Sequence, residues 1–256
     1  FILAFFPAHG VKAGAPLLDI QQITSESGLK AWFVEDHSVP VISLRFAFRD
    51  AGSRQDSEAL QGRAHLLASM LTEGAGDLDS EAFQASLRDN AIRMGFANGR
   101  DHIYGELTTL RRHRDMAGDL LNLALTRPRF DPSDLGRIQA ASISRLKRDL
   151  SRPDWAAARL SNDLQYEGHP YALNSGGTLK TLPEITVSDL KSMHKDMLAQ
   201  ANLVIGLTGD LSREEARQWL DTIFQGLQKQ PDLKSPGDIP LQNRGVSAMC
   251  PRPISG

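Results

Sequence analysis

The chain has 256 residues, of which 41% are hydrophobic and 23% are charged, and its formal net charge is −2. This is the composition of an ordinary folded protein, and the small net charge gives no general attraction to nucleic acid or to an anionic membrane. The single cysteine, Cys250, excludes an intrachain disulfide and a cysteine-based zinc site.

The beginning of the chain has the pattern of a secretory signal peptide. Residues 1–6 are an apolar run that is too short to cross a bilayer, and Ala13 and Ala15 fit the small-residue rule for signal-peptidase cleavage. We therefore expect residues 1–15 to be a signal-peptide remnant, and the protein to be periplasmic or secreted in a bacterial envelope. A disordered or strand-like N-terminal arm is the alternative. No later segment of the sequence approaches membrane-spanning length.

The next part of the chain predicts two strands and a helix. Residues 29–34 and 41–48 alternate between inward and outward side chains, and the turn between them predicts a β-hairpin. Residues 57–71 carry apolar side chains at helical spacing, and Gly74 and Gly76 are expected to stop this helix.

The remaining elements predict an α+β fold with a mixed, mainly antiparallel sheet packed by helices. Ser80 is a good cap for a helix at 81–90, and the Asn98-Gly99 turn predicts a strand pair. In chain order we expect strands at 92–97 and 102–110, helices at 114–126, 132–150, 154–166 and 187–197, a buried strand at 201–208, and a helix at 212–224 with a Ser212–Glu215 capping box.

The predicted helix at 57–71 contains part of a zinc-peptidase motif. In H-x-x-E-H the two histidines bind zinc and the glutamate activates the attacking water. In that frame this chain has His65, Ala68 and Ser69. Together with Gly52-Ser53-Arg54 before the helix and the strand 203–208 with its Gly-Asp turn, this segment resembles the pitrilysin-type zinc peptidases. That family includes the mitochondrial processing peptidase and the insulin-degrading enzymes.

The resemblance covers about residues 20–227 and implies a degenerate site. The fold would be one half of a pitrilysin-type two-domain subunit. The third zinc ligand of active members, a glutamate, would correspond to Arg145, whose guanidinium cannot bind a metal. With Ala68 and Ser69 also changed, we expect no catalytic residue and no metal in this chain, and zinc in an active partner. Ser69 shares a helix face with His65, which predicts a hydrogen bond between them.

The resemblance also implies a place for a peptide. In the family, the strand after the second helix offers its edge to an extended peptide, a known mode of recognition. The matching segment is 92–98, so we expect Phe96, Ala97, Asn98 and the following Arg100 to contact substrate. Prolines and glycines interrupt residues 228–256, so we expect one domain at 16–227, then a linker and the truncated start of a second homologous domain.

The expected function is that of a non-catalytic subunit in a bacterial zinc-metallopeptidase heterodimer. It would help to form the chamber and hold peptide for the active subunit. One alternative is a scaffold subunit like the core subunits of a respiratory complex, and another is an active metallopeptidase with a relocated site. No histidine pair at helical spacing, hydrolase elbow, P-loop or dinucleotide fingerprint occurs in the sequence.

Overall fold

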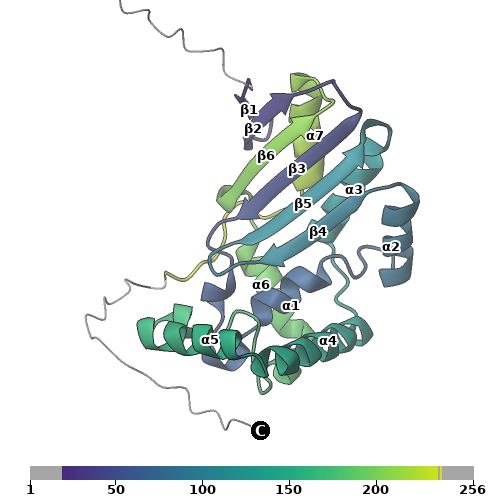
Figure 1. Ribbon diagram of the computed structural model, residues 1–256. Coiled ribbons are helices and arrows are strands. Elements are labelled where there is room, and N and C mark those ends of the chain that lie inside the picture. Colours follow the sequence, from purple (N-terminus) through teal and green to yellow (C-terminus); the bar gives the residue numbers. More distant parts are fainter. Residues whose placement is uncertain (1–18, 236, 238–256) are drawn as a thin grey trace, which may run out of the picture.

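The computed structural model describes residues 19–235 and 237, which form one sheet with helices around it (Figure 1). The sheet has six strands in the order β1-β2-β6-β3-β5-β4. The signal-peptide remnant predicted at 1–15, and residues 238–256 of the predicted linker and truncated second domain, lie outside the described residues. Within the described part, no helix is both long enough and apolar enough to cross a membrane.

The observed elements confirm the predicted α+β fold. The strands are β1 (Gln21–Thr24), β2 (Lys30–Glu35), β3 (Val41–Phe48), β4 (Arg93–Asn98), β5 (Ile103–Leu110) and β6 (Leu203–Gly209). The helices are α1 (Arg63–Met70), α2 (Ser80–Asp89), α3 (Arg114–Thr126), α4 (Pro132–Leu150), α5 (Pro153–Gln165), α6 (Val187–Met197) and α7 (Arg213–Phe224). Among these strands, β2 and β6 pair in parallel and all other neighbours are antiparallel.

The hairpin predicted from residues 29–34 and 41–48 is wrong, although both strands exist. Strand β6 lies between β2 and β3 and pairs with each of them. Local alternation identifies a strand but not its neighbour, and the connection at 36–40 is long enough to step over one strand position. Ile205 and Leu207 of β6 are buried, so this strand contributes to the core from its position inside the sheet.

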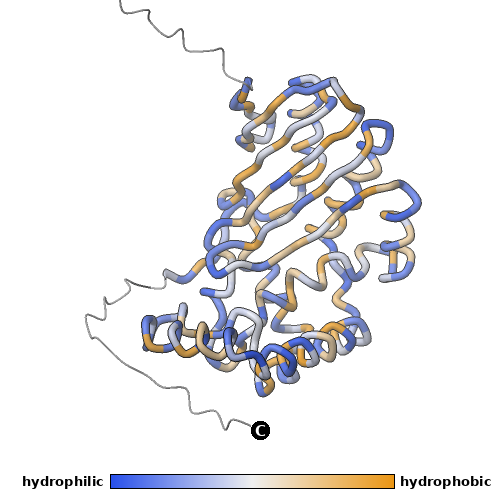
Figure 2. Tube along the Cα trace, in the orientation of Figure 1, coloured by the Kyte–Doolittle hydropathy of each residue, from blue (hydrophilic) through white to orange (hydrophobic). Residues whose placement is uncertain are grey.

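The two faces of the sheet differ. Helices α3 and α7 pack together on one face, where Phe33, Leu44 and Phe46 are buried. On the other face Trp32 and Tyr104 are about half exposed. Figure 2 shows hydrophobic residues recurring along the strands and along α1, which lies beside the β4 end of the sheet. The apolar core therefore joins the sheet to the helices below it.

The helix predicted at 57–71 is shorter than expected. Two short 3-10 turns, Ser53–Gln55 and Glu58–Leu60, precede α1. Gly62 has φ +93°, a left-handed conformation that interrupts any helix running from residue 57. The helical spacing of the apolar residues was real, but α1 begins only after this glycine.

Other local predictions are confirmed, with differences at the ends. The β4–β5 pair joined through Asn98-Gly99 and the Ser212–Glu215 capping box are both present. Helix α2 is capped by Asp79, whose carboxylate accepts from the backbone N–H of Ala82, while the Ser80 hydroxyl donates to Glu73. The short strand β1 was not predicted, since its four residues show too little alternation.

The boundary predicted between residues 227 and 228 stays a prediction. The described residues after it form no helix or strand. They do follow the domain surface, because the carbonyl of Gln228 accepts from the N–H of Gln200 at 2.9 Å. Further along, the N–H of Lys234 donates to the side chain of Gln55 at 3.1 Å.

Candidate functional site

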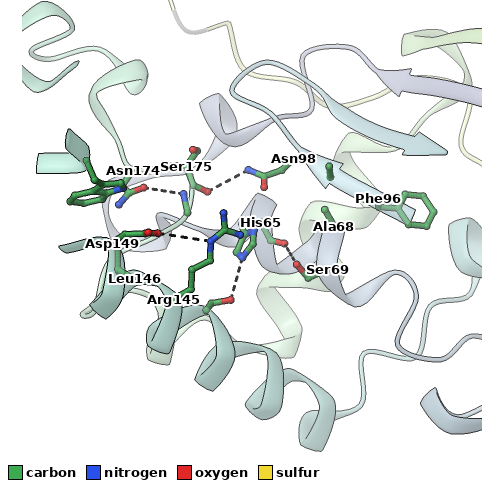
Figure 3. Close-up of a pocket in the computed structure, with 14 residues that line it drawn as sticks. His65, Ala68, Ser69, Phe96, Asn98, Arg145, Leu146, Asp149, Asn174 and Ser175 are labelled. Atoms are coloured by element: carbon green, nitrogen blue, oxygen red, sulfur yellow. Dashed lines mark hydrogen bonds and ion pairs between the residues drawn. The ribbon is translucent and has the colours of Figure 1, made fainter. Parts of the chain in front are cut away.

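A pocket of about 490 Å³ lies between α1, the end of β4, α4, and the start of α5 (Figure 3). The four positions that match the zinc-peptidase site all line it, although α1 and α4 are far apart in the sequence. The lining residues are His65, Ala68, Ser69, Phe96, Ala97, Asn98, Ser142, Arg145, Leu146, Asp149, Trp155, Asn174, Ser175 and Gly176. The structure therefore brings together the four positions that the resemblance assigned to the zinc site.

His65 is partly buried and is held from α4. Its Nε2 atom lies 3.2 Å from the hydroxyl of Ser142. Burial lowers the pKa of His65, a hydrogen bond with Asn98 raises this pKa by less, and the nearby Arg145 charge lowers it further. The net shift favours the neutral ring. The bond predicted between Ser69 and His65 exists, but the Ser69 hydroxyl donates to the backbone carbonyl of His65 at 2.9 Å and not to the ring.

Arg145 lines the pocket at the position that the resemblance assigned to the third metal ligand. Its side chain is 73% exposed, and its Nε lies 3.9 Å from a carboxylate oxygen of Asp149. Its guanidinium keeps its charge in a protein and repels a cation. In the same pocket, the Ala68 side chain has no atom that could bind a metal. The Ser69 hydroxyl donates a hydrogen bond to the helix backbone.

These residues do not fit zinc. A catalytic zinc site needs three protein ligands and an open position for water, and here a single imidazole stands beside a guanidinium. In the part of the chain that the structure describes, no group of three histidine, cysteine, aspartate or glutamate side chains could hold a metal elsewhere. No step of a zinc-dependent reaction can therefore be assigned to the described residues of this chain.

Strand β4 forms one edge of the sheet and leads into the pocket. Among the described strands it pairs only with β5. The Phe96 ring packs edge-on against Phe46 at 6.1 Å between centroids, Ala97 is exposed, and Asn98 donates to the carbonyl of Ser175 at 3.4 Å. The structure thus places Phe96, Ala97 and Asn98 together at the pocket, and their role in binding substrate stays a prediction.

Arg100 lies outside the pocket lining. Its guanidinium donates to the side-chain oxygen of Asn162 at 2.7 Å and lies over two rings, 5.3 Å from Tyr166 and 5.0 Å from Tyr171. Such cation–π contacts fix the guanidinium where it is. Arg100 therefore ties the tip of the β4–β5 hairpin to α5 and the segment after it.

Several lining residues were missed from the sequence. Ser142 and Asp149 lie three and four positions from Arg145 on α4, so helical spacing could have found them. Trp155, Asn174 and Ser175 belong to α5 and the long segment after it. No local pattern in the sequence connects that segment to α1.

Two family models match the chain. Residues 40–165 match the model described as Insulinase (Peptidase family M16), and residues 184–249 match the Peptidase M16 inactive domain. The chain belongs to the M16 peptidase family. The expected resemblance and fold class are confirmed.

Similar proteins agree with this assignment. The "Non-peptidase homolog YmxG" of Helicobacter pylori is 26% identical over 85% of this chain and 50% of its own length. The mitochondrial-processing peptidase subunit beta of Saccharomyces cerevisiae is 22% identical over 77% of this chain and 44% of its own length. A crystal structure of a peptidase M16 inactive domain from Pseudomonas fluorescens has a TM-score of 0.81 and 31% identity, and the match covers 87% of this chain and 54% of that one.

The chain spans about half the length of these M16 relatives. One of them is named a non-peptidase and another is named as a subunit of a processing peptidase. M16 chains therefore include members that do not act as peptidases and members that work as subunits. Both observations bear on what an M16 chain with a degenerate site does.

Restoring the ligands should restore metal binding. The variant Ala68→Glu, Ser69→His, Arg145→Glu rebuilds the H-x-x-E-H frame and the third ligand at positions that already line one pocket. We expect this triple variant to retain about one zinc per chain after dialysis, measured by atomic emission, and the parent chain to retain none. The single variant Arg145→Glu is the control, because His65 and one carboxylate are too few ligands. Zinc in neither protein would show that the pocket does not superimpose its ligands as the motif requires.

Proposed function

We propose that this chain is a non-catalytic subunit of a bacterial M16 zinc-peptidase heterodimer. It helps to form the chamber and holds an extended peptide along β4 while an active partner, which carries the zinc, cleaves it. The proposal includes a location in the bacterial envelope, which rests on the signal-peptide pattern at residues 1–15.

One observation carries the proposal: the positions that match the zinc site share a pocket with the outer edge of β4, which no other described strand pairs with. Phe96, Ala97 and Asn98 line the same pocket as Ala68 and Arg145. A strand edge offers backbone N–H and C=O groups to an extended peptide, whatever the peptide sequence. Loss of the metal removes the chemistry from this pocket and leaves that edge available, which supports a holding role.

The names of the similar proteins support the proposal of an active partner subunit. The yeast relative is named as one subunit of a processing peptidase, and the Helicobacter relative as a non-peptidase. A chain that cannot bind zinc needs a second chain to contribute to proteolysis. A scaffold subunit without any peptide ligand is the competing function, and it predicts no binding at the β4 edge.

Peptides with a modified backbone test the holding role. Along a strand, successive N–H groups point to opposite sides, so an added strand uses only alternate ones. We expect N-methylation of one alternate set to abolish binding of an extended peptide to the purified chain, and methylation of the other set to have little effect. Fluorescence anisotropy of the labelled peptides measures both. Equal affinity for the two methylated sets, or no binding of any peptide, would contradict peptide holding at this edge.

A further inference from the structure

We propose that the degenerate zinc pocket is a carboxylate subsite, in which Arg145 binds an acidic side chain of the peptide that lies along β4. The inference rests on the proposed function, since it names the kind of residue that the held peptide presents. It assigns a ligand class, an anionic carboxylate, to a place where active members of the family hold a cation.

The Arg145 guanidinium is only loosely held in the pocket. Arg145 and Asp149 are the lining residues with fixed charges, and they lie 3.9 Å apart, near the outer limit of an ion pair. Asp149 also lies 3.7 Å from Arg152, whose closer partner is Asp154. Among the described residues this long contact is the ion pair of Arg145, so its N–H donors remain available to a second carboxylate. With its side chain 73% exposed, Arg145 can turn its fork of N–H donors toward a ligand.

Hydrogen-bonding side chains line the pocket together with Arg145. Asn98 and Asn174 bring side-chain amides into the pocket (Figure 3). Ser142 also lines the pocket and brings a hydroxyl. The amide nitrogen of Asn98 uses one hydrogen on the carbonyl of Ser175, at 3.4 Å, and carries a second hydrogen. These groups can complete the solvation of a carboxylate that Arg145 binds.

The pocket lies beside the last residues of β4. In an extended peptide every second side chain projects to the same side, at intervals of about 7 Å. A peptide paired with the free edge of β4 passes Phe96, Ala97 and Asn98 and sends one such side chain toward Arg145. Leu146 and Trp155 line the same pocket and offer apolar surface to the methylene groups of a glutamate.

A series of matched peptides tests the subsite. Extended peptides, acetylated and amidated at their ends, carry a single glutamate or a glutamine in its place. We expect the glutamate peptide to bind the full chain roughly tenfold more tightly, since a charge-assisted pair with arginine is lost in the glutamine peptide. Arg145→Gln should remove this preference. Arg148→Gln, which removes an exposed charge of the same helix outside the pocket, should retain it.

A small probe separates this inference from the proposed function. The α-amide of N-acetylglutamate, compared with the α-amide of N-acetylglutamine, should shift the NMR resonances of the His65 ring in the parent chain and not in Arg145→Gln. The two probes differ only in the side-chain carboxylate. If the small probe binds but no peptide does, the carboxylate subsite stands and peptide holding fails. If peptides bind with equal affinity for glutamate and glutamine, peptide holding stands and the subsite is wrong. A response to the glutamate probe that survives Arg145→Gln would also overturn the subsite.

Discussion

Replacing Asp56 by alanine is expected to destabilise the fold by about 3 kcal/mol, measured by urea unfolding at pH 5. The Asp56 side chain is 1% exposed and lies 3.5 Å from Arg63. Its carboxylate accepts from the N–H of Gly62 at 3.1 Å and from the N–H of Ala64 at 3.2 Å. The variant leaves these donors and the Arg63 charge without their acceptor at the start of α1, the helix that carries His65.

A surface ion pair provides the control for Asp56. Asp115 pairs with Arg114 at 2.8 Å but is 81% exposed, so Asp115→Ala should cost at most about 1 kcal/mol. Equal losses for Asp56→Ala and Asp115→Ala would show that the buried carboxylate does not organise the start of α1.

The same residue gives the fold a dependence on pH. Burial raises the pKa of Asp56 from 3.8 to about 7, against the opposing effects of Arg63 and the two N–H donors. The folded state therefore binds the proton more tightly than the unfolded state, and this contribution to stability is fully present below pH 3.8. It is lost as the pH rises toward 7. Relative to Asp56→Asn, which does not titrate, the parent chain should lose about 4 kcal/mol across that interval. A constant difference between the two proteins would contradict the assignment.

Gly52→Ala is expected to destabilise the protein by about 3 kcal/mol. A Cβ atom at Gly52 would lie 2.6 Å from the carbonyl oxygens of Gly99 and Arg100, which are backbone atoms and cannot rotate away. The N–H of Gly52 donates to the carbonyl of Asp101 at 3.0 Å in the same contact. This close approach docks the segment before α1 on the tip of the β4–β5 hairpin. We expect weaker peptide binding as well, since Asn98 lies at the start of that turn.

Gly136→Ala is the matched control. Gly136 lies within α4, and a Cβ atom there would meet nothing within 4 Å. An alanine in a helix is favoured over glycine by about 1 kcal/mol, so this variant should be slightly more stable than the parent chain. The midpoint temperatures of thermal unfolding compare the stabilities of the two variants. A Gly52→Ala protein as stable as Gly136→Ala would show that the hairpin tip can move away from Gly52.

The sequence predicted the elements of this fold better than their pairing. The alternation of residues 41–48 and the turn at Asn98-Gly99 are local signals. Strand β3 and the β4–β5 pair were found where these signals predicted them. The position of β6 between β2 and β3 is set by contacts across the sheet, which no local pattern contains. The predicted start of the helix at residue 57 was wrong for a local reason: Gly62 has a left-handed conformation, and α1 begins after it.

The candidate site was predictable where it follows a motif. The frame of His65, Ala68 and Ser69 and its resemblance to a zinc-peptidase helix led to Arg145 on another helix, and the structure joins all of them in one pocket. Trp155 and Asn174 were not predicted, because they enter the pocket through α5 and the segment after it. Arg100 was expected to contact substrate, which stays a prediction; its contacts with Tyr166 and Tyr171, more than sixty positions away, were not predicted.

Zinc analysis of the pure chain, and of any complex recovered with it from the source organism, tests the central claim most directly. We expect a pure chain without zinc and without peptidase activity. We also expect a recovered M16 partner that has an intact H-x-x-E-H helix and carries about one zinc. A pure chain that retains about one zinc would contradict the interpretation of Ala68, Ser69 and Arg145 as a site that has lost its metal.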